Sequence, residues 1–125
     1  MNRERRAVIA LTSLTLADAY ALALQRENWS VVFAQDEEEA RELTHEIRPD
    51  LVLLSAHRSP DAGFLMCDIL TREAPNAKVV LISEQVTPSE HAYALLVGAF
   101  AIHDEEADPS WLLETIDGLT PVLTY

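Results

Sequence analysis

The chain lacks several features that mark specialised classes of protein. Its single cysteine, Cys67, excludes an internal disulfide framework and suits a reducing compartment, so we expect a cytoplasmic protein. No apolar run approaches the roughly 20 residues that cross a bilayer, and the first residues lack the apolar region of a signal peptide. Only 9 residues are basic against 21 acidic ones, and the resulting net charge of −12 argues against direct binding of DNA or RNA.

What the sequence does contain is a regular alternation of short β-rich runs and helical stretches. Strands are predicted at residues 7–11, 30–33, 51–54, 78–82 and 100–102. Helices are predicted at residues 15–26 and 62–72, and three more begin at the caps Asp36, Thr87 and Asp108. Because the connections are short, this order predicts one α/β domain with a doubly wound, five-stranded parallel sheet and five helices.

The residues that begin and end the helices agree with this periodicity. Asp36 with Glu39, and Thr87 with Glu90, have the spacing of capping boxes, in which a side chain at each end of the first turn binds the backbone of the other. Gly98 is placed to end the fourth helix in the left-handed conformation, and Gly118 to end the fifth.

Three blocks of sequence, in this order, resemble parts of the receiver domain of bacterial two-component response regulators. RPDLVLLSAHRSPDAG (48–63) is similar to its third strand and following loop, AKVVLISEQ (77–85) to its fourth strand, and VGAFAIHDEEADPSWLLETI (97–116) to its fifth strand and last helix. The resemblance covers nearly the whole chain. It implies a flavodoxin-like (βα)5 domain with strand order 2-1-3-4-5 over residues 1–119, followed by a C-terminal tail, residues 120–125.

The resemblance also implies where a phosphorylation site would lie. Receivers accept a phosphoryl group on an aspartate after the third strand, hold Mg²⁺ with an acid pair after the first, and contact the phosphoryl oxygens with a hydroxyl and a lysine. An aromatic residue of the fifth strand acts as a switch. By position, the acid pair falls on Thr12 and Ser13, the phosphoacceptor on Ser55, the hydroxyl on Ser83, the lysine on Glu105 and the aromatic residue on Ile102.

The residues themselves argue against phosphotransfer. Mg²⁺ needs hard oxygen ligands, usually carboxylates, yet no acid lies between Arg5 and Ala17. Ser55 has no evident general base, and the only lysine, Lys78, is predicted at the far end of the fourth strand. We therefore predict a non-catalytic pseudo-receiver without a cofactor, which acts in signal transduction through another protein, with self-association left open.

Other classes of function remain open at this stage. His57 and His103, with the nearby carboxylates of Asp61, Asp104 and Glu105, could hold Zn²⁺, but their spacing matches no common zinc motif. A small molecule could bind at the same strand ends, although a flavin phosphate site at residues 12–15 would lack the usual glycines. A phosphoryl-accepting receiver with unusual chemistry is the remaining alternative.

Two surfaces are candidates for contact with a partner. In the family, the face made by the fourth helix, fifth strand and fifth helix often mediates contacts, and here it would include Tyr93, Leu96, Phe100 and Trp111. The first helix is apolar beyond one narrow stripe, which is typical of either deep burial or an interface; its large apolar residues are Leu14, Leu16, Tyr20, Leu22 and Leu24.

Overall fold

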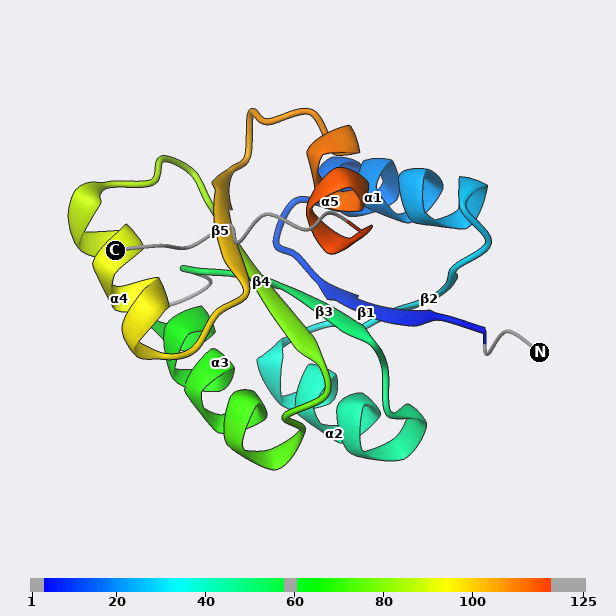
Figure 1. Ribbon diagram of the computed structural model, residues 1–125, viewed down its shortest axis with the longest axis horizontal. Helices are drawn as coiled ribbons and strands as arrows, with labels where there is room; N and C mark the ends of the chain where they lie inside the picture. Colours follow the sequence, from blue (N-terminus) through cyan, green and yellow to red (C-terminus); the bar gives the residue numbers. More distant parts are fainter. Residues whose placement is uncertain (1–3, 58–60, 118–125) are drawn as a thin grey trace.

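The computed structural model describes residues 4–57 and 61–117. Five parallel strands form one sheet in the order β2-β1-β3-β4-β5 (Figure 1). The strands are β1 (Arg6–Ala10), β2 (Ser30–Phe33), β3 (Leu51–Ser55), β4 (Lys78–Ser83) and β5 (Ala101–Asp104). The helices are α1 (Leu14–Arg26), α2 (Glu37–Ile47), α3 (Ala62–Glu73), α4 (Pro88–Leu96) and α5 (Ser110–Asp117). The flavodoxin-like fold and the strand order predicted from the sequence are confirmed.

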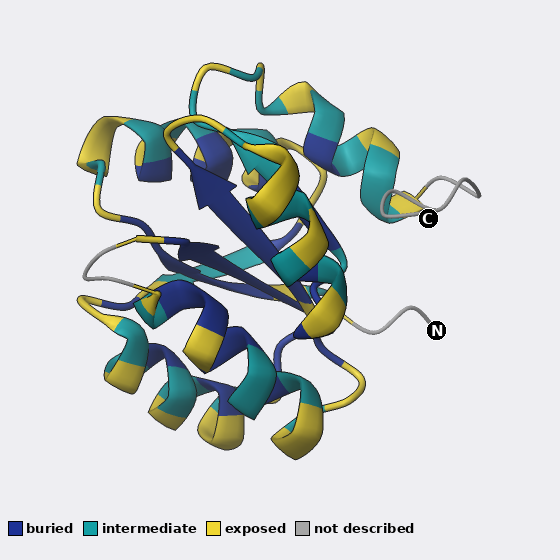
Figure 2. Ribbon diagram, turned by 90° about the vertical axis from the view of Figure 1, so that its left-hand side faces the viewer, coloured by how far each residue is buried: buried dark blue, intermediate teal, exposed yellow. Residues whose placement is uncertain are grey.

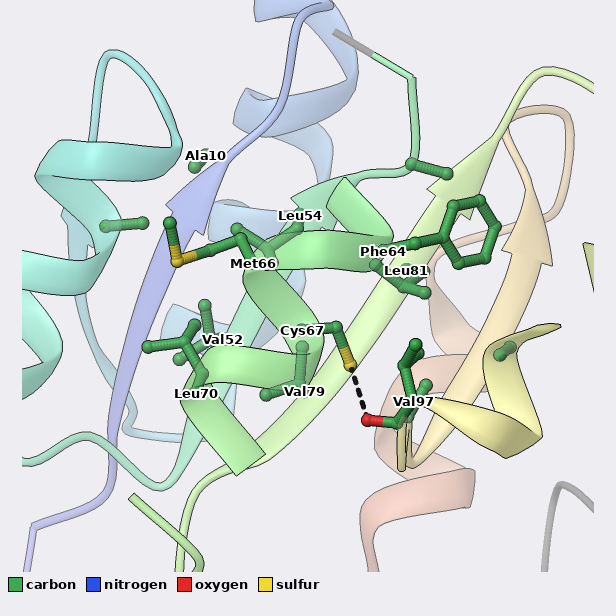
Figure 3. Close-up of a cluster of buried hydrophobic side chains, with 14 of the residues drawn as sticks. Ala10, Val52, Leu54, Phe64, Met66, Cys67, Leu70, Val79, Leu81 and Val97 are labelled. Atoms are coloured by element: carbon green, nitrogen blue, oxygen red, sulfur yellow. Dashed lines mark hydrogen bonds between the residues drawn. The ribbon is translucent and has the colours of Figure 1, made fainter. Parts of the chain in front are cut away.

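Helices cover both faces of the sheet, which explains why its central strands are continuous apolar runs. On one face, α2, α3 and α4 pack over a core that Figure 3 shows around α3, with Phe64, Met66, Cys67 and Leu70 lying against Val52, Leu54 and Leu81. On the other face, α1 and α5 bury a second core that includes Ile9, Tyr20, Leu24, Leu53 and Leu112.

The caps predicted at Asp36 and Thr87 form, but in neither does the glutamate bind the N–H of the cap residue itself. Asp36 Oδ1 accepts from the backbone N–H of Glu39 at 2.8 Å, and Thr87 Oγ1 accepts from that of Glu90 at 3.1 Å. The Glu39 carboxylate accepts in return from the N–H of Gln35, one residue before the cap. For Glu90 the prediction is wrong, because its carboxylate turns away from the cap and toward the end of β4.

Two of the three glycines meet specific demands of the backbone. Gly98 follows α4 with φ +80°, the left-handed conformation predicted for it. Gly63 begins α3 so close to the end of β3 that a Cβ there would lie 2.2 Å from the carbonyl oxygen of Ser55. The predicted helix stop at Gly118 and the predicted tail, residues 120–125, lie outside the described residues.

Cys67 is a buried core residue. Its Sγ donates to the carbonyl of Val97 at 3.7 Å (Figure 3), and burial raises the pKa of the thiol to about 12. A thiol held protonated in this way is a poor nucleophile and a poor metal ligand.

None of the described helices is long and apolar enough to cross a membrane.

Candidate functional site

A pocket of about 340 Å³ opens where β3 and β4 end and the chain leaves β1. In open α/β sheets this edge, beside the point where the strand order reverses, is the usual place for a ligand. Its lining brings together four of the predicted positions, Thr12, Ser55, Ser83 and Glu105, and adds His57 and Glu90. Ser13 and Ile102 are not part of it.

Ser55 holds the loop that follows β1. Its buried Oγ accepts a hydrogen bond from the backbone N–H of Thr12 at 2.9 Å and lies 3.3 Å from the Thr12 hydroxyl. Neither partner can act as a general base, so this hydroxyl is not activated as a nucleophile. The interaction instead fixes the β1–α1 loop against the end of β3.

The segment after β1 contributes no carboxylate to this pocket. Ser13 caps α1, its Oγ accepting from the backbone N–H of Leu16 at 3.1 Å. The first acid in α1, Asp18, lies along a separate groove. Of the residues between β1 and α1, only Thr12 lines the pocket, so a pair of carboxylate ligands for Mg²⁺ is missing from this wall.

Glu90 is the site residue that the sequence did not reveal. The buried Ser83 hydroxyl donates to Glu90 Oε1 at 2.5 Å, and also lies 3.3 Å from the carbonyl oxygen of Gln85. The Glu90 side chain is only 19% exposed, and His57 Nε2 lies 3.5 Å from the same carboxylate oxygen. A carboxylate of the protein's own α4 therefore occupies the position beside Ser83. The only signal in the sequence was that α4 begins at this edge of the sheet.

The pocket is acidic. Glu84, Glu90 and Glu105 line it, and among the described residues no lysine or arginine does. Lys78 begins β4 at the opposite edge, where its Nζ lies 5.5 Å from the centre of the Phe100 ring. Since like charges repel more strongly in a partly buried site than in water, this lining disfavours a phosphoryl group.

The structure does not bring together the two histidines considered as zinc ligands. The His57 ring lies 5.4 Å from that of Phe64, on the α3 side of the sheet, whereas His103 stacks on Trp111 at 4.4 Å, on the α5 side. Within residues 4–57 and 61–117, no group of three or more His, Cys, Asp or Glu residues is arranged to hold a metal ion.

The aromatic residues of the predicted interaction face mostly contact other parts of the domain. Tyr93 stacks on the buried Phe64 at 4.6 Å, and Phe100 is half-buried. Leu96, by contrast, is 80% exposed on α4, whose outer surface Figure 2 shows beside β5. Ile102, at the switch position, is buried in the core beneath α3 and α4.

Trp111 links α5 to α1. Its Nε1 donates to the hydroxyl oxygen of Tyr20 at 3.0 Å, while its ring stacks on His103. Burial raises the pKa of Tyr20 to about 12, although the hydrogen bond from Trp111 opposes this shift. Trp111 therefore stabilises the packing of α5, and only part of its side chain is accessible to a partner.

The apolar residues of α1 divide between core and surface. Tyr20 and Leu24 are buried, whereas Leu14 and Leu22 are exposed. Burial thus explains the apolar residues on one side of the helix, and an interface on its exposed side stays a prediction.

No family model matches the sequence, and no curated protein does. Solved structures do match. A response regulator from Thermotoga maritima has a TM-score of 0.82 at 20% identity, with 91% of this chain and 95% of that chain covered. The signal receiver domain of the putative response regulator NarL from Mycobacterium tuberculosis has a TM-score of 0.80 at 21% identity, with 92% and 94% covered.

A third similar structure is informative about chemistry. A response regulator protein from Burkholderia pseudomallei, solved with a phosphorylated aspartic acid, a calcium ion and citrate, has a TM-score of 0.80 at 19% identity, with 92% of this chain and 67% of that chain covered. Together these likenesses show that the chain has the fold of response regulator receiver domains, as the sequence resemblance predicted.

Proposed function

We propose that this domain is a pseudo-receiver, which acts in signal transduction in the cytoplasm by contact with another protein, without catalysis and independently of aspartyl phosphorylation. The observation that carries the proposal is the 2.5 Å hydrogen bond from Ser83 to the carboxylate of Glu90. The receiver fold supports the signalling part of it, and the chemistry of the strand-end pocket supports the rest.

The Ser83–Glu90 hydrogen bond replaces the interaction that a phosphoryl group would make. In receivers, the hydroxyl after the fourth strand contacts the phosphoryl oxygens; here a carboxylate from α4 already accepts from it. A phosphoryl group in the same pocket would have to displace that carboxylate and would meet Glu105, with no lysine or arginine among the described lining residues to offset the repulsion. The end of β4 and the start of α4 are therefore held together with no modification.

The proposal is tested by exposing the protein to Mg²⁺ and acetyl phosphate and measuring its intact mass. The expected result is an unmodified mass, whereas an active receiver treated in parallel gains a phosphoryl group. A hydroxylamine-labile adduct on this protein would overturn the proposal.

A single variant shows whether the missing acceptor alone prevents phosphorylation, or whether the missing Mg²⁺ ligands also prevent it. Ser55→Asp supplies the acceptor carboxylate, as in the phosphorylated neighbour, but Thr12 and Ser13 still offer no carboxylate to Mg²⁺. We expect this variant also to stay unmodified. Its phosphorylation would show that Ser55 alone blocks the reaction.

The partner-contact part of the proposal places an interface on the α4–β5–α5 face, with Leu96 as its exposed apolar residue. Leu65, 56% exposed on α3, is a matched control outside this face. Size-exclusion chromatography with light scattering is expected to show any self-association weakened by Leu96→Ser and unchanged by Leu65→Ser. Trp111→Ala is less suitable, because it also removes the contacts with Tyr20 and His103.

A further inference from the structure

A second recess, which adjoins the strand-end pocket at Thr12, lies between α1 and the end of β2. It encloses about 530 Å³. Most of its lining is apolar, contributed by Ile9, Leu11, Leu14, Ala17, Phe33 and Ala34. We call it the α1–β2 groove.

The apolar residues of the α1–β2 groove are arranged as a buried floor between exposed walls. Ile9 and Leu11 are buried beneath it, whereas Leu14 is 78% exposed and Phe33 49% exposed. Leu22 is also exposed, eight residues after Leu14, and so lies about two turns further along the same side of α1. A partner that covers these large apolar side chains would gain binding free energy, because their burial removes apolar surface from water.

The surroundings of the groove are acidic. Asp18 lines it, and the exposed Asp36 and Glu38 follow directly after the lining residues Ala34 and Gln35. None of the residues in its lining is basic, and the chain as a whole carries a net charge of −12. A second copy of the chain would bring the same acids to the groove, whereas a basic partner would be attracted to it.

We propose that the α1–β2 groove binds a basic amphipathic helix of a partner protein. The apolar side of that helix would cover Leu14 and Phe33, and its lysines and arginines would face Asp18 and Asp36. Leu14 and Leu22 are spaced about 12 Å apart along α1, which is close to the rise of about 10.5 Å between the i and i+7 positions of a helix lying beside it. The inference rests on the proposed function, in which the domain acts by binding proteins, and it adds a second contact surface to the α4–β5–α5 face and names the chemistry of the partner there.

A synthetic peptide tests this directly. The probe has leucines at i, i+3, i+4 and i+7 spacing and lysines elsewhere, and its control has the same composition in an order that destroys the apolar face. In a titration followed by ¹H–¹⁵N NMR, the amphipathic peptide is expected to shift the amides of α1, Phe33 and Gln35. The peptide should gain helical circular dichroism on binding, and added salt should weaken the complex.

Variants locate the contact. Leu14→Ser and Phe33→Ser are each expected to weaken binding about tenfold, as expected when an apolar anchor loses its burial. Asp18→Asn should reduce the dependence of the affinity on salt. Leu65→Ser replaces a leucine of similar exposure on α3 and should leave the affinity unchanged. Thermal melts of each variant check that it is folded.

Several results would overturn the inference. Equal binding of the two peptides, equal affinities for Leu14→Ser and Leu65→Ser, or shifts confined to the α4–β5–α5 face would each do so. A concentration-dependent dimer abolished by Leu14→Ser would show that a second copy fills the groove. Shifts along the edge of β2 without a gain in helical signal would show an extended peptide instead.

The outcome of the phosphorylation test does not depend on the outcome of the peptide titration, so the two proposals can fail separately. A phosphoryl adduct would remove the proposed pseudo-receiver function and leave the peptide titration as it is. An unmodified mass together with no peptide binding would remove the groove inference alone.

Discussion

Glu73 and Glu90 both lie beside a histidine, but among the residues that the structure describes only Glu73 is also paired with an arginine. At the end of α3, Glu73 accepts two hydrogen bonds from the Arg41 guanidinium, at 2.9 and 2.5 Å, and its Oε1 lies 2.8 Å from His45 Nε2. These hydrogen bonds, from Arg41 first and His45 second, lower the pKa of Glu73 to about 2. This cluster joins α2 to α3 on the outside of the domain.

Glu90 has a different set of neighbours at the strand ends. It accepts from the neutral hydroxyl of Ser83 and lies 3.5 Å from His57, while Glu105 lines the same pocket. Arg41 binds the Glu73 carboxylate with two parallel hydrogen bonds, which is the geometry in which arginine binds anions well. In this domain that pair lies between α2 and α3 and not at the strand-end pocket. At the place where a receiver would bind a phosphoryl group, the described residues supply hydroxyls, carboxylates and the His57 ring, but no lysine or arginine.

The largest effect is expected where the start of α3 packs against the end of β3. In Gly63→Ala, a Cβ would meet the Ser55 carbonyl oxygen at 2.2 Å, so α3 must move away from β3. We expect a loss of about 3 kcal/mol in the free energy of unfolding, measured by urea denaturation. Gly98→Ala is the matched control: its Cβ meets Thr71 only at 3.4 Å, and the strain of its φ of +80° should cost about 1 kcal/mol. Equal losses in the two variants would contradict this account.

A smaller effect is expected from breaking the Ser83–Glu90 hydrogen bond. Ser83→Ala should cost about 1.5 kcal/mol of unfolding free energy, because the bond is to a charged group that is largely buried. A double-mutant cycle with Glu90→Gln should give a coupling of about 1 kcal/mol. The exposed Ser89, in the same turn of α4, offers Ser89→Ala as a control without effect. Additive losses in the cycle would mean that the two side chains do not interact in solution.

Ser55→Ala should cost about 1 kcal/mol, since the N–H of Thr12 loses its acceptor but can turn to water. The sharper measurement is hydrogen exchange, in which the Thr12 amide should lose protection while the amides of β4 keep theirs. Unchanged protection of Thr12 would contradict the role of Ser55 in holding the β1–α1 loop.

The smallest effect concerns the exposed cluster around Glu73. Its pKa is lower in the folded protein, about 2 against 4.5, so its ionisation favours the folded state. That contribution is complete above pH 4.5 and is lost as the pH falls toward 2. Thermal melts across this range should show wild type approaching Glu73→Gln in stability as the pH falls. A difference that stays constant down to pH 2 would contradict the lowered pKa.

The sequence was sufficient for the fold and for most of the pocket positions. Apolar runs bounded by caps predicted the five strands, and the strand ends brought Thr12, Ser55, Ser83 and Glu105 to one edge. It was not sufficient for Glu90, because a glutamate in the first turn of a helix can bind either its own cap or a neighbouring strand end. That choice depends on tertiary packing, which local spacing does not encode.

The histidines show the same limit in another form. His57 and His103 do reach the same edge of the sheet, as their positions predicted. Side chains alternate between the two faces of a strand, however, and the packing carries His103 toward Trp111 and His57 toward Phe64. Positions along the same edge therefore do not bring the two rings together, and the zinc site that was left open as an alternative gains no support from their geometry.

The close approach of α3 to β3 has a consequence for engineering. Gly63 meets the backbone of Ser55 and Ala56, so the helix is seated on main-chain atoms and not on the Ser55 side chain. The Ser55 side chain holds the Thr12 amide instead, so substitutions at position 55 are expected to act on the β1–α1 loop and to leave the seating of α3 unchanged.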